Sequence, residues 1–154
     1  MKNNSKILIL EFVYCLIIFQ SKILAEEIFF DTLELNITDN GNMVNAGVGS
    51  VISKDDNIKI DAQSFKYNKI DSILNATNGF AIIGQEEIRI KADKFIYDKS
   101  LSTLKAIGNV EVNDKENDIF IRSEDILYQK KNKLIESNVK STFIDKLGNN
   151  IVTD

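Results

Sequence analysis

Hydrophobic and polar residues alternate along most of the chain after residue 28. In Ile88-Arg89-Ile90-Lys91-Ala92 the apolar side chains fall on one side of an extended backbone and the charged ones on the other. This period of two is typical of a half-buried β-strand. No stretch after residue 28 keeps a period of 3.6 residues long enough for a helix. We therefore expect an all-β domain.

The alternation changes phase within each strand. After Ala92 the next apolar residues are Phe95 and Tyr97, at odd spacing from the first set. A shift of one residue moves side chains to the other face of a strand. A β-bulge near Asp93-Lys94 would bring both apolar sets back to one side.

Residues typical of turns and bends separate the strands. Asp98-Lys99-Ser100 predicts a turn, and the next strand begins over residues 103–106. Gly108-Asn109 indicates a bulge or bend, after which the strand resumes at Val110. Residues 114–117 form the next expected turn.

The pattern returns about every 30 residues. Residues 58–62, 88–92 and 119–123 are copies of one segment, and residues 43–49, 73–79 and 104–110 are copies of another. Weaker copies lie at 28–37 and 134–139. One hairpin cannot bury its apolar face alone, but several stacked hairpins can. We expect stacked antiparallel hairpins, solenoid-like or jelly-roll-like, with an apolar interior and a Lys/Asp/Asn exterior.

A stack of this kind has two open ends. Each end exposes unpaired strand edges, which favour strand addition by another copy or a partner. Residues 151–154 resemble residues 90–93, the opening of a unit, so the chain is expected to stop inside a fifth unit. Either another polypeptide covers this edge, or the domain is incomplete at its C-terminal end.

Residues 1–25 have the features of an export signal peptide. Two lysines precede a nearly apolar run over residues 7–19, and Ala25 offers a small residue for cleavage. An uncleaved N-terminal anchor is the alternative, although the run is shorter than the roughly 20 residues of a comfortable membrane span. In either case residues 26–154 form the repeat domain, which we expect to leave the cytoplasm.

Composition excludes several classes of function. The 154-residue chain is 44% hydrophobic and 27% charged, as is ordinary for a globular domain, and its net charge of −4 favours no nucleic-acid partner. It has no His, which excludes Ser-His-Asp and Cys-His sites and removes the commonest metal ligand. Its one cysteine, Cys15, lies in the leader. We expect no enzymatic activity, no metal site and no cofactor.

Two stretches together resemble the OstA-type repeat of lipopolysaccharide-transport proteins. They are Ile-x-Ile-x-Ala-Asp-x-Phe-x-Tyr-Asp at 88–98 and Leu-x-Ala-x-Gly-Asn-Val at 104–110. The resemblance covers roughly residues 28–154 and is strongest over 58–112. The third unit departs from it, with Ser123-Glu124 in place of Ala-Asp and Ser137-Asn138-Val139 in place of Gly-Asn-Val. These departures leave the number of units open.

The resemblance implies a twisted, open β-jelly roll whose interior holds the acyl chains of lipid A. The family includes LptA, LptC and the N-terminal domain of LptD, whose copies join edge to edge into a periplasmic bridge. It thus implies lipopolysaccharide binding, edge-strand addition to other Lpt proteins, and a place in the periplasm in association with the outer membrane. An LptD N-terminal fragment or an LptA-like protein fits best, whereas LptC would need the leader as an anchor.

The inward positions of the repeat are the candidate lipid-binding residues. They are Ile58, Ile60, Phe65, Tyr67, Ile88, Ile90, Phe95, Tyr97, Val110, Val112, Ile119, Ile121, Ile126 and Tyr128. The same residues could instead form a filled core, as in any β-sandwich. The three tyrosines recur at one repeat position, where they could meet polar lipid groups or pack a ring and send the hydroxyl to water.

Two other classes compete with lipid transport. A structural or adhesive exported β-repeat protein would have much the same sequence, and a hollow interior would separate the two. A polysaccharide-acting enzyme would need paired carboxylates and exposed aromatic platforms. Exposed aromatics are expected to be scarce, and neither a catalytic pair nor a calcium loop stands out among the acidic residues near the unit starts, Asp61, Asp93, Glu124 and Asp125. We expect these carboxylates to be solvated.

Overall fold

The computed structural model describes residues 28–85, 88–145 and 147–153. Over these residues the chain is all-β, as the alternation predicts, apart from two single-turn 3-10 helices. The elements are β1 (Ile28–Thr32), β2 (Leu35–Thr38), η1 (Asp39–Gly41), β3 (Met43–Ala46), β4 (Gly49–Ser53), β5 (Ile58–Asn68), β6 (Ile73–Ile83), β7 (Ile88–Asp98), β8 (Thr103–Asp114), β9 (Ile119–Gln129), η2 (Lys130–Asn132), β10 (Leu134–Glu136), β11 (Ser141–Ile144) and β12 (Asn150–Thr153). Among the described residues, no helix is long and apolar enough to cross a membrane. The expected export signal over residues 1–25 lies outside the described residues.

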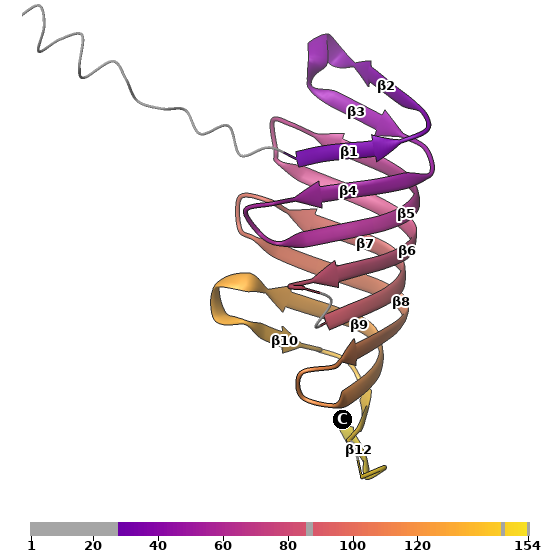
Figure 1. Ribbon diagram of the computed structural model, residues 1–154, viewed down its shortest axis with the longest axis vertical. Helices are drawn as coiled ribbons and strands as arrows, with labels where there is room; N and C mark the ends of the chain where they lie inside the picture. Colours follow the sequence, from indigo (N-terminus) through magenta and orange to yellow (C-terminus); the bar gives the residue numbers. More distant parts are fainter. Residues whose placement is uncertain (1–27, 86–87, 146, 154) are drawn as a thin grey trace, which may run out of the picture.

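The strands form one open antiparallel sheet that follows the chain order β4-β5-β6-β7-β8-β9 through its middle. The expected stack of antiparallel hairpins is therefore confirmed, and Figure 1 shows the strands stacked along the long axis of the molecule. The sheet does not close on itself. Its ends are β1 and β2 at one end of the stack and β10 and β12 at the other.

Each long strand belongs to two layers, because it bends near its middle. Residues 58–62 of β5 pair with β4, whereas residues 65–68 pair with β3. The first layer contains β1, β4, β11, β12 and residues 58–62, 79–83, 88–92, 110–114 and 119–123. The second layer contains β2, β3, β10 and residues 65–68, 73–77, 94–98, 103–107 and 125–129. The inner faces of the two layers enclose the interior.

The bends lie where the sequence changes phase. In the β7–β8 pair the register shifts between Lys91 and Lys94, and in the β8–β9 pair it shifts between Ile107 and Val110. Both shifts place the extra residue on β8, which confirms the bulge expected at 108–109. The bulge expected near 93–94 is not formed by β7 itself: β7 keeps its register with β6 and only bends there. In β7 the side chains of Asp93 and Lys94 both point outward, so that Ala92 and Phe95 are both buried although they are an odd three positions apart.

A glycine is required where the bends of neighbouring strands come closest. Gly79 pairs with Ala62 of β5, and a Cβ atom at residue 79 would lie 2.0 Å from the carbonyl oxygen of Asp61. Gly49, one repeat earlier, also pairs with Ala62, from the other side of β5. Small residues at these repeat positions therefore let the strand backbones approach closely at the bend.

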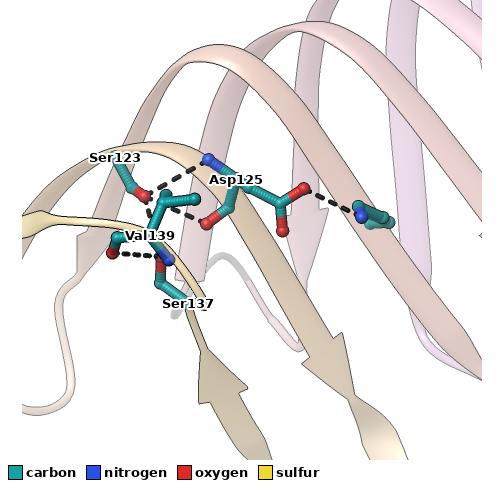
Figure 2. A network of polar contacts seen from close by, with 5 residues as sticks. Ser123, Asp125, Ser137 and Val139 are labelled. Carbon is teal, nitrogen blue, oxygen red and sulfur yellow. Dashed lines mark hydrogen bonds and ion pairs between the residues drawn. The ribbon is translucent and has the colours of Figure 1, made fainter.

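Three serines compensate for the departures from the repeat in the last unit. The Ser123 Oγ lies 2.9 Å from the Ser137 Oγ (Figure 2). The Ser141 Oγ lies within hydrogen-bond distance of both, at 3.0 and 2.9 Å. Ser137 also accepts a hydrogen bond from the backbone N–H of Val139. Ser123 and Ser141 are buried, so these mutual hydrogen bonds satisfy hydroxyls that alanine would not carry.

The turns lie along the side of the stack opposite the bends, on the left in Figure 1. Four-residue turns at 54–57, 69–72, 99–102 and 115–118 each end in a residue with φ between 52° and 57°. Each of these turns joins two strands of the same layer. Within the described residues the chain passes between the layers at the bends, so the side that carries the turns, called the open side below, is not closed by the backbone.

The N-terminal unit departs from the expected repeat. Ile28 and Phe30 pack against the core as predicted, and the Phe30 ring meets Phe65 and Tyr67 at centroid distances of 6.4 and 6.2 Å. Leu35 and Ile37, which the repeat places inward, are exposed. Because β2 is an edge strand that pairs with β3 alone, little surrounds its side chains.

Candidate functional site

The interior between the layers is the candidate site. All fourteen predicted positions lie in it: eleven are buried members of one hydrophobic cluster, while Tyr67, Ile88 and Ile119 are partly buried and pack against it. The bends in the strands explain how residues of both phases reach one interior. Lipid contact by these residues remains a prediction.

The middle of this interior is filled by side chains. Phe95 is 0% exposed and Tyr97 1% exposed, and Ile90 and Val112 are likewise fully buried. Side chains packed in this way leave no room for an acyl chain without rearrangement. For these residues the structure favours the core interpretation over direct lipid contact.

The interior is hollow toward the end formed by β9, β10 and β11. A pocket of about 560 Å³ lies there, within the range of ligand sites. Its apolar lining is made of Ile83, Ile88, Ile119, Ile121, Tyr128, Ile135 and Phe143. Its polar lining is made of Asp56, Asn57, Gly84, Asp114, Glu116, Asn117, Lys130 and Lys133. The two sets give the pocket an apolar body and a charged, partly exposed mouth.

The sequence identifies part of this pocket. Ile88, Ile119, Ile121 and Tyr128 are among the fourteen predicted positions, whereas Ile83, Ile135 and Phe143 are not. Ile135 lies in the weak copy at 134–139, and aligning that copy with the stronger ones could have indicated it. The hollow itself has no signal in the sequence, since it depends on how β10 and β11 separate after pairing with the two halves of β9.

The carboxylate of Asp56 lies at the boundary between the pocket and the packed middle. It accepts hydrogen bonds from the Tyr97 hydroxyl, from the Ser102 hydroxyl at 2.9 Å and from the Lys130 ammonium group at 2.9 Å. The Tyr97 hydroxyl also lies 2.8 Å from the Ser53 Oγ. Asp56 and Ser53 belong to the first layer and the other three residues to the second, so this cluster joins the layers across the open side.

These contacts keep Asp56 ionised. Burial alone would raise the pKa of the carboxyl group, but the hydrogen bonds from Tyr97, Lys130 and Ser102, together with the Lys130 charge, hold its pKa below the ordinary value of 3.8. Burial, and then the nearby Asp56 charge, raise the pKa of Tyr128 above 10.0, so its hydroxyl stays neutral at the pocket wall. The boundary therefore carries one fixed negative charge, balanced by Lys130.

The three recurring tyrosines have different environments. Tyr97 buries its hydroxyl in the Asp56 cluster, which neither sequence-based alternative describes. Tyr128 lines the pocket, while Tyr67 packs its ring near Phe30. Position in the repeat therefore fixes the direction of the ring but not the partner of the hydroxyl.

The acidic residues near the unit starts have partners on the outer surface. Asp61 accepts a hydrogen bond from Ser50 and pairs with Lys59 at 3.1 Å, and Asp125 pairs with Lys105 at 2.8 Å. The Asp93 carboxylate accepts a hydrogen bond from Asn109 at 2.7 Å. In the part of the chain that the structure describes, no group of three or more His, Cys, Asp or Glu could hold a metal ion.

The outer face of the first layer carries more aromatic surface than the sequence predicts. Phe29 is exposed, and the half-buried rings of Phe80 and Phe120 lie beneath guanidinium groups. Arg89 lies 3.8 Å above the Phe80 ring and Arg122 5.0 Å above the Phe120 ring. The three phenylalanines lie on β1, β6 and β9, at outward positions of the first layer.

No family model matches the sequence, and no curated protein matches it. Among solved structures the chain is similar to LptH from Pseudomonas aeruginosa, which is the LptA-homologous periplasmic component of a lipopolysaccharide transport device. The TM-score is 0.63 at 9% sequence identity, and the match covers 84% of this chain and 96% of LptH. This chain has the fold of LptH. The fold that the OstA-type resemblance implies is thus confirmed.

Proposed function

We propose that this chain binds lipopolysaccharide through its acyl chains and passes it along a periplasmic β-bridge to the outer membrane. The observation that carries the proposal is the apolar pocket between the layers of a chain that has the LptH fold. The proposed activity is binding and passage, without covalent chemistry and without a cofactor.

The pocket suits one end of an amphipathic lipid. Seven apolar side chains form its body, and each methylene group buried there contributes about 0.8 kcal/mol of binding free energy. Its polar lining contains three carboxylates and two lysines. Because Lys130 is paired with Asp56, we propose that Lys133 meets the anionic headgroup oxygens. Of the fourteen sequence-predicted positions, Ile88, Ile119, Ile121 and Tyr128 are the ones we propose to touch lipid directly.

Passage along a bridge requires partners at the ends of the stack. The edge strand β12 exposes more than half of Ile151 and of Val152, and its outer edge is unpaired within the described residues. We propose that other Lpt proteins add a strand at such edges. A signal peptide or anchor at residues 1–25 would place the chain in the periplasm, in association with the outer membrane. The roles of LptA, LptC and the N-terminal part of LptD remain alternatives.

The second candidate is a structural or adhesive exported β-repeat protein without lipid transport. The packed middle of the interior favours it, because a filled core needs no ligand. The pocket beside β10 and β11 favours lipid binding. The two proposals therefore differ in what occupies that pocket in cells.

Site-specific photo-crosslinking in cells tests the proposal. The crosslinker p-azidophenylalanine replaces Phe143 in the pocket, and in a matched variant it replaces Phe120, which lies on the neighbouring strand and points outward. A lipopolysaccharide adduct at position 143 and none at position 120 is the expected result. An exported and folded protein without an adduct at position 143 would leave the structural β-repeat as the better account.

A further inference from the structure

The turn at 54–57 is the place where the first layer reaches across the open side. Asp56 contacts three residues of the second layer that are 41, 46 and 74 positions away in the chain. Lys130 also donates a hydrogen bond to the backbone carbonyl of Asp55, so the turn is held through both side chain and backbone. These contacts connect parts of the fold that the strand ladder leaves unconnected.

We infer that Asp56, Tyr97 and Lys130 form a latch that holds the two layers together across the open side and ends the pocket. Asp56 and Lys130 line the pocket, whereas Tyr97 and Ser53 lie on the packed side of it. Asp56 and Lys130 thus form the wall of the pocket at the open side, and an opened latch would give an acyl chain that enters beside Phe143 a way toward Phe95. The role of the latch in limiting an acyl chain rests on the proposed function, whereas its role in holding the two layers together does not.

The chemistry of the latch gives it two discrete states. With all contacts made, the Asp56 carboxylate has hydrogen-bond donors in place of water. A partly opened latch would leave a buried carboxylate and a buried tyrosine hydroxyl without partners, which is unfavourable. The layers are therefore either joined here or separated far enough for water to reach both groups. In the separated state the interior between Ser53 and Tyr97 becomes accessible from the pocket.

Spin-label distances across the open side test the latch without lipid. Labels at Asp55 and at Leu101 place one probe on a turn of each layer, and both side chains are exposed. In a chain in which Cys15 is replaced by Ser, we expect a narrow distance distribution. Asp56→Ala should shift it to longer distances and broaden it. The matched control is Asp71→Ala, because Asp71 hydrogen-bonds Asn68 in its own turn and lies in a single layer.

A folded Asp56→Ala protein with an unchanged distribution would overturn the latch. Lys130→Met provides a second measurement in case loss of Asp56 prevents folding, since Lys130 is partly exposed and removing its charge leaves Tyr97 and Ser102 as donors to Asp56. It should broaden the distribution less than Asp56→Ala. If neither folded variant differs from the control, the layers are held by other contacts.

Crosslinking then tests whether the latch limits how far an acyl chain can enter the interior. With p-azidophenylalanine in place of Phe95, the unaltered latch should give no lipopolysaccharide adduct, and Asp56→Ala should produce one at several times the background. If position 143 gives no adduct, the proposed function fails, but the spin-label distances still show whether the latch holds the layers together. If position 143 gives an adduct and an opened latch still gives none at position 95, the latch does not limit the lipid path.

Discussion

At the scale of single residues, Asp56 couples stability to pH. Its folded-state pKa lies below 3.8, so its contribution is fully present above that value and is lost as the pH falls through the lowered pKa. Asp56→Asn should lower the free energy of unfolding at pH 7 by about 1–3 kcal/mol. Urea unfolding at a series of pH values measures the difference between the two proteins.

That difference should shrink at acid pH, because the protonated carboxyl group of Asp56 and the amide group of the substituted side chain are similar neutral groups. A difference that stays constant from pH 7 to below the lowered pKa would mean that the carboxylate charge is not what holds the cluster. Asp145 is a poor position for the same experiment. Hydrogen bonds from the Asn149 side chain and backbone lower its pKa as well, but its turn is exposed and joins no layers.

Gly79 shows how strictly the bend selects for the absence of a side chain. Its φ is not in the left-handed region, so the constraint is the approach of the β5 backbone and not local strain. Gly79→Ala should destabilise the fold by about 1–3 kcal/mol or more, as overpacking does. Gly47→Ala is the control, since a Cβ atom there meets its nearest neighbour at an ordinary 3.6 Å. Equal midpoints in urea for the two variants would contradict this account of the bend.

At the scale of elements, strand positions and bends could be predicted because each is encoded locally. The phase change between Ala92 and Phe95 marks the bend of β7, and the period of about 30 residues repeats the same signal in other strands. The three serines show the limit of this approach. Compared position by position with the other units, Ser123 and Ser137 are departures from the repeat. In the fold they are hydrogen-bond partners of each other.

The pocket and the Asp56 cluster could not be predicted, because both depend on distant elements meeting. Asp56 and Lys130 are 74 residues apart, and nothing in either turn specifies the other. The hollow beside Phe143 arises because β10 and β11 are short and pair with different halves of β9. Alternation predicts which side chains face inward, but not whether the space between them is filled.

Removal of an aromatic ring should lower the free energy of unfolding more in the packed middle than beside the pocket. Phe95 on β7 is 0% exposed, so Phe95→Ala should lower the free energy of unfolding by about 3–5 kcal/mol. Phe143 on β11 borders the pocket and is only partly buried, so Phe143→Ala should cost clearly less. Urea unfolding of both variants gives the comparison. Equal losses would mean that the pocket is filled in solution.

At the scale of the whole molecule, the fold is a linear stack whose stability is unevenly distributed. The ladders between β5 and β6 and between β6 and β7 each pair ten residues, whereas β10 pairs three residues of β9. In such a stack each strand is supported mainly by its neighbours, so the ends open more readily than the middle. The pocket lies at the less supported end, where opening to admit a ligand disturbs few contacts.

Hydrogen exchange measures this distribution directly. We expect amide protection to be highest in β6, β7 and β8, which are paired on both sides along nearly their whole length, and lowest in the edge strands β2, β10 and β12. Lipopolysaccharide should slow exchange in β9, β10 and β11 if it occupies the pocket, and leave the middle unchanged, because the middle is already closed. Uniform protection along the chain would indicate a single cooperative unit with no flexible end. Slowing confined to β6 and β7 would place the ligand in the packed middle and contradict the assignment of the pocket.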